Sequence, residues 1–319
     1  MKKVINFAVL GPGKIANVVL DAIREKVDFN FYAVASRDIN RANDFKDKFG
    51  FEKAYGTYDE LYLDEQVDLI YIATPHAFHY EQMKECIKHN NNVFCEKAFT
   101  LNALQAEEVL ALAKKHKVLV AEAMLTAYLP SRALIRELID SNEIGDVVSY
   151  NGVFANSLKH VERVVNKSLG GGALLDIGIY PLFFAIAMFG KNFELKDIKI
   201  TEFQEIDSST SFSLHYPNGF KANIYTSIEE EKGIFGEIFG TKGKIYIENI
   251  ARPSKIIIYD KTGNIKRSIN SVRDTSGYEY EFQAVLNALL NNKLECSEMT
   301  YDDTLFLMKT MDQVLKEIN

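Results

Sequence analysis

The chain has 319 residues, a length that suggests about two domains. Hydrophobic residues make up 47% of it and charged residues 25%, which is the composition of a globular protein and excludes a disordered, collagen-like or disulfide-scaffold chain. The net charge of −7 disfavours a large contact with a nucleic-acid backbone, because such a contact needs a basic face. A small anionic ligand held by a few local residues stays compatible with this charge.

The cysteines and the start of the chain indicate where the protein works. Cys86, Cys95 and Cys296 are odd in number and lack C-x-x-C spacing, so the sequence supports neither a disulfide framework nor a thiolate zinc site. Reduced thiols fit a cytoplasmic protein. The basic start Met1-Lys2-Lys3 precedes only a short apolar run, and no stretch of 18 apolar residues occurs. We therefore expect a cytoplasmic protein without a signal peptide or a membrane span.

The first third of the chain alternates short apolar runs with longer amphipathic segments. The patterns predict strands over residues 5–10, 31–35, 67–73, 93–95 and 118–121, and helices over 15–26, 39–49, 81–89 and 104–115. Strands that alternate with helices are typical of an α/β fold with a parallel sheet covered by helices on both faces. We expect the first third of the chain to form a doubly wound parallel sheet.

The pattern changes near Gly145, where longer strands begin to dominate. Strands are predicted over residues 147–155, 211–216, 220–227, 236–239 and 244–248, with turns at Pro217-Asn218-Gly219 and Thr241-Lys242-Gly243. Helices are predicted over 174–189, 278–290 and 302–318. This half should form a mostly antiparallel sheet combined with helices. We expect its last helix to return to the first domain.

A glycine-rich turn follows the first predicted strand. Gly11-Pro12-Gly13-Lys14-Ile15-Ala16 has the pattern G-x-G-x-x-A, between a strand and a helix as the dinucleotide fingerprint requires. Gly11 permits the tight turn, Gly13 lets the backbone approach a pyrophosphate, and Ala16 keeps helix and strand close. The helix N-terminus offers unpaired N–H groups to that anion. A turn without ligand is the alternative, which the position and the later motifs disfavour.

The end of the second predicted strand indicates which nucleotide binds. An enzyme specific for NAD places an acid here to bond the ribose 2′-hydroxyl. Ser36 stands at that position, Arg37 follows it, and Arg41 lies one helical turn further on. Guanidinium groups bind a 2′-phosphate well. Asp38 is displaced from the acid position and is expected to cap the next helix. The residues favour NADP(H), with NAD(H) as the other possibility.

Three further segments carry polar groups at points where ligands of such folds bind. Thr74-Pro75-His76-Ala77-Phe78-His79 and Glu96-Lys97-Ala98 each follow a buried strand, at the carboxyl edge of the predicted sheet. Gly170-Gly171-Gly172 and Asp176-Ile177-Gly178-Ile179-Tyr180 open a helix of the second domain. Each residue also has a structural interpretation: a solvated lysine at Lys97, a helix-dipole acid at Asp176 or a core tyrosine at Tyr180.

Taken together, these segments resemble the Gfo/Idh/MocA family of oxidoreductases, and within it the branch of the dimeric dihydrodiol and D-xylose dehydrogenases. The resemblance covers nearly the whole chain. It rests on the ordered set of the glycine turn, Ala73-Thr74-Pro75 with His79, Glu96-Lys97, Gly170-Gly171-Gly172, Asp176-Ile177-Gly178-Ile179-Tyr180 and Phe239-Gly240-Thr241-Lys242-Gly243. It implies a Rossmann dinucleotide-binding domain over residues 1–122 and an α+β domain for substrate binding and oligomerisation over residues 123–319, with a large open, mostly antiparallel sheet. It also implies an NAD(P)-dependent oxidation or reduction of a sugar, cyclitol or related diol, in a homodimer or homotetramer assembled through the C-terminal sheet.

The resemblance also implies residue roles. Lys97 matches the lysine of the family's Glu-Lys-Pro motif, while Asp176 and Tyr180 match its D-x-G-x-H/Y motif. We expect Tyr180 to be the acid/base, Lys97 to tune it, and Asp176 to hold the substrate hydroxyl or orient Lys97. The expected cofactor contacts are Gly11, Pro12, Gly13, Lys14, Ile15, Ser36, Arg37, Arg41, Thr74, Pro75, His79, Glu96 and Lys97.

The chain departs from the family pattern in two places. Ala98 replaces the proline after Glu-Lys, and Thr126-Ala127 stands where members often carry a bulky or basic residue. Because the chain has no tryptophan, its pocket must be built from other side chains. The candidate substrate contacts are His76, Tyr128, Asn156, Lys159 and Arg163. Lys159 and Arg163 either accept an acidic or phosphorylated sugar or are simply solvated.

The predicted function is hydride transfer between nicotinamide C4 and a carbinol or carbonyl carbon of a small molecule. Two alternatives stay open. One is a non-catalytic relative that binds NAD(P) as a sensor or regulator, and the presence of Lys97, Asp176 and Tyr180 disfavours it. The other is a reductase of a non-sugar carbonyl or bilin-like substrate. The histidines show no metal spacing, so we expect no metal, and we expect no nucleic-acid or membrane partner.

Overall fold

The computed structural model describes residues 4–270 and 276–317, and in it the chain divides into two compact units. The first unit comprises the described residues of Met1–Met124 and Thr275–Leu305, and the second those of Leu125–Asp274 and Phe306–Asn319. Helix α10 therefore groups with the first unit, although it follows the second in sequence. The predicted domain boundary between residues 122 and 123 stays a prediction, since this division does not test it.

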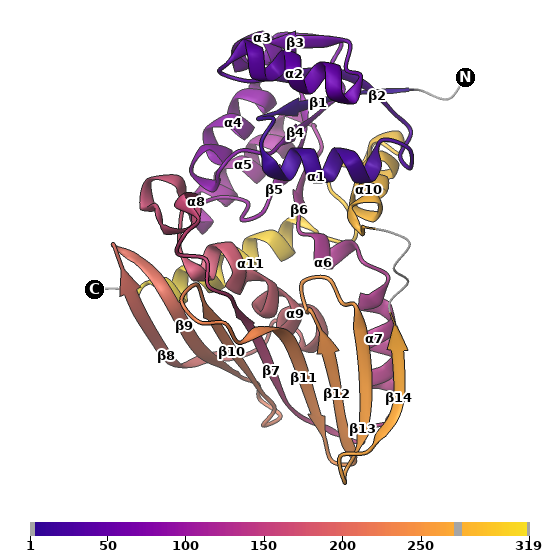
Figure 1. Ribbon diagram of the computed structural model, residues 1–319, viewed down its shortest axis with the longest axis vertical. Helices are drawn as coiled ribbons and strands as arrows, with labels where there is room; N and C mark the ends of the chain where they lie inside the picture. Colours follow the sequence, from indigo (N-terminus) through magenta and orange to yellow (C-terminus); the bar gives the residue numbers. More distant parts are fainter. Residues whose placement is uncertain (1–3, 271–275, 318–319) are drawn as a thin grey trace. The chain divides into compact units, whose positions relative to one another are not determined.

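The first unit is built on a parallel sheet of strand order β3-β2-β1-β4-β5-β6 (Figure 1). This is the order of the dinucleotide-binding fold that the alternating pattern predicts. Its strands are β1 (Ile5–Leu10), β2 (Phe29–Ala35), β3 (Lys53–Tyr55), β4 (Leu69–Ile72), β5 (Asn92–Glu96) and β6 (Val120–Ala123). Its helices are α1 (Lys14–Ile23), α2 (Ile39–Phe49), α3 (Tyr58–Tyr62), α4 (His76–Lys88), α5 (Ala103–His116), α10 (Tyr278–Leu290) and the start of α11 (Tyr301–Leu315).

The core of the first unit explains why α10 belongs to it. Phe282 on α10 packs against Phe7, Tyr71 and Phe94 of the central strands, with ring centroids 5.8, 5.1 and 4.9 Å apart. All four side chains are buried. The strands of a parallel sheet are buried on both faces, and α10 supplies the cover for one of them. Each fully buried aromatic ring contributes roughly 1.5–3 kcal/mol by area.

The expected elements of the first third are present, and two short ones were missed. Helix α4 begins at His76 and not at residue 81, because Pro75 sets the backbone for its first turn while polar residues there mask the helical period. Strand β3 and helix α3 have only three and five residues. They are too short for periodicity, although Thr57 and Glu60 form a capping box at the start of α3.

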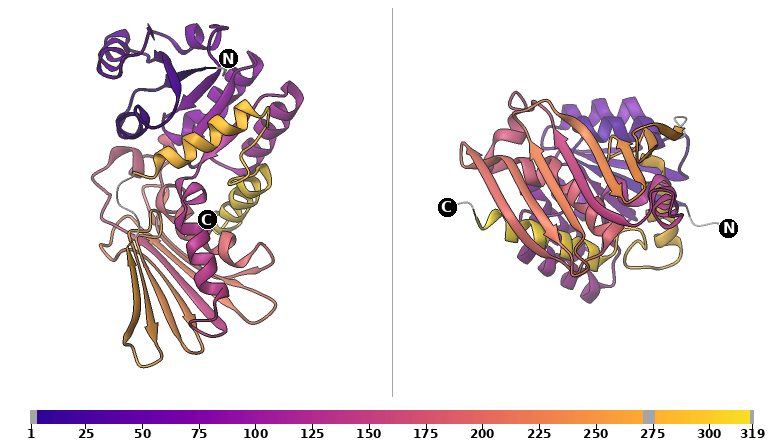
Figure 2. Two further views of the ribbon diagram at one scale, coloured as in Figure 1. Left: turned by 90° about the vertical axis from the view of Figure 1, so that its right-hand side faces the viewer. Right: turned by 90° about the horizontal axis from the view of Figure 1, so that it is seen from below.

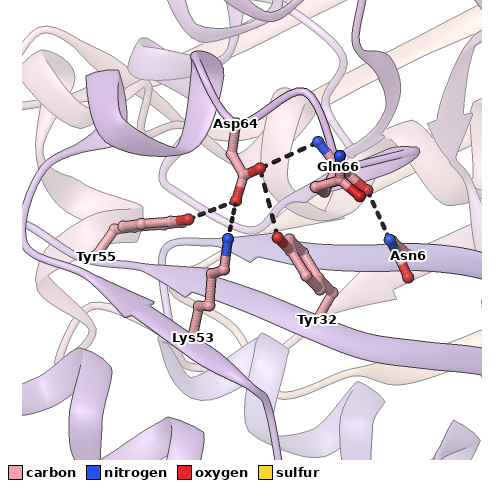
Figure 3. A network of polar contacts seen from close by, with 6 residues as sticks. All are labelled: Asn6, Tyr32, Lys53, Tyr55, Asp64 and Gln66. Atoms are coloured by element: carbon pink, nitrogen blue, oxygen red, sulfur yellow. Dashed lines mark hydrogen bonds and ion pairs between the residues drawn. The ribbon is translucent and has the colours of Figure 1, made fainter.

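A polar network fixes β3 at the edge of the sheet (Figure 3). The Asp64 carboxylate accepts hydrogen bonds from Lys53 Nζ at 2.9 Å, from the Tyr55 hydroxyl at 2.5 Å and from the Gln66 N–H at 3.0 Å. Burial alone would raise the pKa of Asp64, but the hydrogen bonds from Tyr55 and Lys53 outweigh it and hold the pKa at about 2. Asp64 is therefore ionised at neutral pH, and it ties the edge strand to the loop after α3.

The second unit is built on a sheet of strand order β14-β13-β12-β11-β7-β10-β9-β8. Neighbours are antiparallel except β7 and β10, so the expectation of a mostly antiparallel sheet is confirmed. Its strands are β7 (Val147–Ala155), β8 (Glu194–Phe203), β9 (Ile206–His215), β10 (Lys221–Ser227), β11 (Gly233–Gly240), β12 (Gly243–Glu248), β13 (Lys255–Asp260) and β14 (Ile265–Asn270). The predicted turns at residues 217–219 and 241–243 lie between β9 and β10 and between β11 and β12.

Helices of the second unit cover one face of this sheet. They are α6 (Leu125–Tyr128), α7 (Ser131–Asp140), α8 (Glu162–Val165), η1 (Lys167–Leu169), the π-helical η2 (Leu174–Gly178), α9 (Ile179–Phe189) and the end of α11. In the right-hand view of Figure 2 the strands lie in front of these helices. Along β10, Ala222 and Ile224 are buried while Lys221 and Asn223 are exposed, as a sheet with one covered face requires.

Ile318, the last residue of the predicted final helix, lies outside the described residues. The helical stretch Lys167–Phe189 is long and apolar enough to span a membrane, but 83% of its apolar window is buried inside the structure. It is a core helix of the second unit by packing.

Candidate functional site

The turn after β1 has the geometry that a pyrophosphate needs. Gly11 has φ of 90°, a conformation that favours glycine, and its N–H donates to the Ala35 carbonyl at 3.0 Å. A side chain at Gly11 would meet Thr74 Cγ2 at 2.7 Å. Gly13 is the N-cap of α1 and has no side chain to cap it, so the first N–H groups of the helix are left for a ligand. The turn fits a dinucleotide.

The end of β2 contains Ser36 and Asp38 in different roles. Ser36 is buried, and its Oγ accepts a hydrogen bond from the Asp38 N–H at 3.2 Å. The Asp38 carboxylate in turn accepts from the Asn40 N–H at 2.9 Å and caps α2. The interpretation of Asp38 as a helix cap is confirmed.

Two arginines act on one tyrosine near the end of β2. The Arg37 guanidinium lies 5.8 Å from the centre of the Phe78 ring, and Arg37 and Arg41 both act electrostatically on Tyr58. Burial raises the pKa of Tyr58, and the charges of Arg37 and Arg41 oppose that rise. These side chains therefore form a basic corner that suits a 2′-phosphate. Tyr58 and Phe78 were missed by sequence reasoning, although the capping box at Thr57 would have placed Tyr58 at a helix start.

His79 joins the turns that follow β4 and β5. Its ring is fully buried, with Nε2 2.8 Å from the Thr74 carbonyl oxygen and Nδ1 2.9 Å from the Ala98 carbonyl oxygen. Burial lowers the pKa of His79, and a neutral ring donates to one of the two carbonyls. The His76 ring lies 5.8 Å away, and Pro75 is the N-cap of α4. His79 thus positions the backbone of both turns.

Glu96 and Lys97 end β5 with different exposures. Glu96 is buried, and its Oε1 accepts a hydrogen bond from the buried Tyr71 hydroxyl at 2.6 Å. Lys97 is partly exposed, and the Lys97–Ala98 peptide bond is cis. The end of β5 therefore carries a buried charged residue, Glu96, and the partly exposed Lys97 follows it.

In the second unit, Asp176 lies in the π-helical segment Leu174–Gly178, which continues into α9. Single π turns occur frequently at functional sites. Buried Asp207 holds the start of the segment, since its carboxylate accepts from the Leu174 N–H at 2.7 Å. At the other end, a side chain at Gly178 would meet Thr226 Cγ2 at 2.8 Å, so only glycine lets the segment approach β10 this closely.

Arg163 forms a bidentate pair with Asp176. Its two terminal nitrogens lie 2.8 and 3.3 Å from the two carboxylate oxygens, and the Asp176 side chain is only 5% exposed. This pairing was not expected, because Arg163 was singled out as a substrate contact and the two residues lie on different helices. The pair fixes the orientation of the Asp176 carboxylate and balances its charge.

Tyr180 lies at the edge of an apolar cluster. Its ring centre is 5.7 Å from that of Phe154, and the surrounding cluster includes Val164, Ile177 and Ile228. The ring is therefore fixed by packing while Tyr180 itself is partly exposed.

The other predicted substrate contacts have structural partners. Lys159 is paired with Glu229 and lies over the Phe203 ring at 4.2 Å. The Asn156 N–H donates to the Ser227 carbonyl at 3.0 Å, and Tyr128 is buried at the end of α6. The structure thus places Asp176, Tyr180 and Arg163 in one region of the second unit. The grouping of Lys97 with Asp176 and Tyr180 stays a prediction, because they belong to different units.

The chain belongs to the Gfo/Idh/MocA family. Residues 5–124 match the family described as "Oxidoreductase family, NAD-binding Rossmann fold", and residues 133–246 match the "GFO/IDH/MocA C-terminal domain". The family resemblance is confirmed, and the first unit is an NAD-binding Rossmann fold of an oxidoreductase.

Named relatives agree with the expected branch. Trans-1,2-dihydrobenzene-1,2-diol dehydrogenase of Xenopus tropicalis is 32% identical over 98% of this chain and 97% of its own length. The scyllo-inositol 2-dehydrogenase (NADP(+)) IolU of Bacillus subtilis is 29% identical over 98% of this chain and 97% of its own length. Both relatives are dehydrogenases by name, and the dihydrodiol branch is confirmed.

Solved structures share the fold over the whole length. KijD10, a 3-ketoreductase of Actinomadura kijaniata in complex with NADP and TDP-benzene, has a TM-score of 0.90 at 23% identity, covering 98% of each chain. A levoglucosan dehydrogenase in complex with NADH and levoglucosan has a TM-score of 0.86 at 16% identity, covering 98% of this chain and 96% of its own. At these identities the likeness establishes the fold alone.

Proposed function

We propose that the protein is an NADP(H)-dependent oxidoreductase that transfers a hydride between nicotinamide C4 and a carbinol or carbonyl carbon of an uncharged sugar, cyclitol or related diol. The observation that carries the proposal is the family match across both units, with Lys97, Asp176 and Tyr180 all retained. The names of the dihydrodiol and inositol dehydrogenase relatives support the class of substrate.

The residues of the first unit would hold the cofactor, which when bound supplies the hydride chemistry. Gly11, Pro12, Gly13, Lys14 and Ile15 would hold the pyrophosphate, and Thr74, Pro75, His79, Glu96 and Lys97 would border the nicotinamide half. Arg37 and Arg41 would bind the 2′-phosphate beside Ser36. The corner of Arg37, Arg41 and Tyr58 supports NADP(H) over NAD(H), since it concentrates positive charge where an NAD-specific site has an acid.

The proton of the substrate hydroxyl would move to and from Tyr180. An ordinary phenol titrates near pH 10, so phenolate needs a neighbouring cation, and Lys97 would supply that charge. Asp176 would accept a hydrogen bond from a substrate hydroxyl while Arg163 holds its carboxylate in place. The fixed ring of Tyr180 supports this role, because a positioned acid/base is more effective than a mobile one.

The charge balance of the second unit supports an uncharged substrate. Arg163 is neutralised by Asp176, and Lys159 is paired with Glu229. A phosphorylated or acidic sugar would have to break one of these pairs or bind without a counter-charge. A neutral diol can bind without breaking either ion pair. This favours a polyol over the acidic or phosphorylated sugar that the sequence left open.

The test is a titration of the purified protein with NADPH and NADH by cofactor fluorescence, followed by turnover assays. The panel should contain a trans-dihydrodiol, scyllo-inositol, D-xylose and levoglucosan, with sugar phosphates and aldonates as charged counterparts. Tight NADPH binding with turnover on an uncharged substrate is the expected result. Binding without turnover in either direction would support the sensor alternative, and turnover on charged sugars alone would contradict the proposed substrate class.

We also propose a cytoplasmic homodimer or homotetramer assembled through the uncovered face of the large sheet. Tyr225, Phe235 and Asn223 lie together on that face beside polar neighbours, a mixture that suits a protein interface. Light scattering on the wild type and on Tyr225→Glu would test this, with a monomeric variant expected. A wild type that is monomeric at all concentrations would contradict it. The proposal includes no membrane or nucleic-acid partner.

A further inference from the structure

Thr74 follows β4, and the two branches of its side chain have different partners. Its hydroxyl donates to Gln82 Oε1 on α4 at 2.6 Å. Its methyl carbon Cγ2 lies against Gly11, since a Cβ atom added at Gly11 would be only 2.7 Å from it. Thr74 therefore connects α4 to the glycine turn after β1.

Gln82 is a polar side chain in an unusual place. It is only 8% exposed, although glutamine is mostly a surface residue. It lies on α4 three residues after His79, so the two side chains share one face of the helix, and both are buried. Burying an amide costs free energy unless hydrogen bonds compensate it. The contact with Thr74 supplies such a bond to the amide oxygen of Gln82.

Helix α4 holds Thr74 at two points. His79 Nε2 lies 2.8 Å from the Thr74 carbonyl oxygen, which fixes the backbone, and Gln82 holds the hydroxyl. The remaining freedom of Thr74 is rotation about its Cα–Cβ bond, which has three staggered positions. Because the hydroxyl and the methyl group share one Cβ atom, the direction of one sets the direction of the other. The hydrogen bond to Gln82 therefore selects the rotamer whose methyl group faces Gly11.

Gly11 needs an apolar neighbour on this side. Its N–H donates to the Ala35 carbonyl at 3.0 Å, and its own carbonyl accepts from the Gly13 N–H at 2.8 Å. Both polar groups of Gly11 thus have partners within the protein, so a hydroxyl turned toward it would find none there. A rotamer that turns only a hydrogen atom toward Gly11 would leave a gap and lose the packing contact. The Thr74 methyl group therefore supports the turn in its observed shape.

We propose that Gln82 is a positioning residue for the dinucleotide turn. By accepting the Thr74 hydroxyl it holds the Thr74 methyl group against Gly11, and so keeps the turn in the shape that presents the first N–H groups of α1 to a pyrophosphate. The inference rests on the proposed role of this turn in cofactor binding. Because NADPH and NADH share the pyrophosphate, Gln82 affects both cofactors equally, whereas Arg37 distinguishes them.

The first test is a double-mutant cycle of Gln82→Met and Thr74→Val, read as the dissociation constants of NADPH and NADH by cofactor fluorescence. Methionine is similar in length to glutamine but does not replace the amide acceptor. Gln82→Met should raise both constants by about three- to tenfold, because Thr74 then occupies the competent rotamer for only part of the time. At saturating cofactor, kcat should stay near the wild-type value.

The valine variant separates positioning from a general loss of stability. Valine has a methyl group on both branches, so one of them faces Gly11 without any hydrogen bond. In the Thr74→Val background, Gln82→Met should therefore change the dissociation constants by less than about twofold. Glu81→Gln is the control on the same helix, since its side chain is 67% exposed, and it should bind both cofactors as the wild type does.

Two results of this cycle would overturn the proposal. One is a Gln82→Met variant that binds both cofactors as tightly as the wild type. The other is an equal loss of affinity in the Thr74 and Thr74→Val backgrounds, which would mean that Gln82 acts on α4 as a whole and not through the Thr74 hydroxyl.

A second measurement needs no cofactor. In protein with labelled threonine methyl groups, NMR should show a nuclear Overhauser effect between the Thr74 methyl group and the Gly11 Hα atoms, because the two are in contact. Gln82→Met should weaken this signal severalfold. A wild type that binds neither nucleotide would contradict the proposed function, and the NMR result still decides the role of Gln82. A signal of equal strength in the wild type and Gln82→Met would overturn the inference.

Discussion

The turns after β1 and β5 lie at the same edge of one sheet but hold their shape in different ways. The first turn offers backbone N–H groups, and its conformation depends on Gly11 at positive φ. The second offers a side chain, Lys97, and the neighbouring Ala98 carbonyl oxygen lies 2.9 Å from Nδ1 of buried His79. A turn fixed by glycine does not respond to protons. The second turn contacts a titratable ring, and because burial lowers the pKa of His79, we expect that contact to change only at acid pH.

The largest expected effect concerns the chemical step alone. Lys97→Ala and Tyr180→Phe should each lower kcat by about 10²–10⁴-fold, the range that general acid–base groups contribute. NADPH affinity should change little in Tyr180→Phe, because that side chain belongs to the second unit. Steady-state kinetics and fluorescence titration measure both quantities. If Tyr180→Phe keeps wild-type kcat while Lys97→Ala abolishes it, the lysine is the proton carrier.

A matched pair of glycine variants tests the first turn. Gly11→Ala has to adopt φ of 90° and meets Thr74 Cγ2 at 2.7 Å, so both Tm and NADPH affinity should fall, affinity by about 100-fold. Gly13→Ala meets protein atoms no closer than 3.8 Å, so it should fold normally and still lose affinity, because its methyl group would take space that a bound pyrophosphate needs. Equal affinity in wild type and Gly13→Ala would contradict the proposed binding turn.

Cofactor preference should shift by a smaller factor when the basic corner is removed. Arg37→Ala should weaken NADPH binding by about 10–100-fold, since charge-assisted hydrogen bonds contribute roughly 1.5–3 kcal/mol each. NADH binding should change far less. Tyr58→Phe is a milder variant that keeps both guanidinium groups and should fall between wild type and Arg37→Ala. The ratio of the two dissociation constants is the measurement, and an unchanged ratio in Arg37→Ala would exclude a 2′-phosphate contact.

The smallest expected effect compares two acids with opposite pKa shifts. Asp64 titrates at about 2, below its usual 3.8, so its contribution to stability is present above pH 3.8 and is lost as pH falls toward 2. The pKa of Glu122 is shifted in the opposite direction, because burial raises it. Asp64→Asn should lower stability at pH 7 by about 1 kcal/mol, because the network is partly solvated. Urea unfolding at pH 7 and pH 3 measures this, and a loss that does not shrink at low pH would contradict the assignment.

Local features of the fold were predictable because their causes are local. Asp38 is followed at once by the helix it caps, and the glycine turn lies between the strand and helix that its pattern requires. The antiparallel sheet followed from strand lengths and the turn at Pro217-Asn218-Gly219. In each of these cases the residues that determine the structure are neighbours in sequence, so a pattern in the sequence is enough.

The rest depends on partners that lie far apart in sequence. Thr304 and Glu122 are separated by 182 residues, and Leu174 and Asp207 by 33. The pairing of Arg163 with Asp176 likewise needs the fold, and it changes Arg163 from a substrate contact to a partner of the candidate catalytic acid. Buried polar residues such as Glu122 carry no periodic signal, because a single acid in an apolar strand interrupts the pattern that predicts the strand.

The most direct test of the proposed function is an initial-rate assay of the purified protein with NADP⁺ and with NAD⁺ on uncharged diols and cyclitols, beside their phosphorylated counterparts. We predict measurable NADPH formation on at least one uncharged substrate, a higher kcat/KM with NADP⁺ than with NAD⁺, and no turnover of the phosphorylated compounds. Turnover with NAD⁺ in preference to NADP⁺, or on charged substrates only, would contradict the roles assigned to Arg37, Arg41 and the paired Arg163.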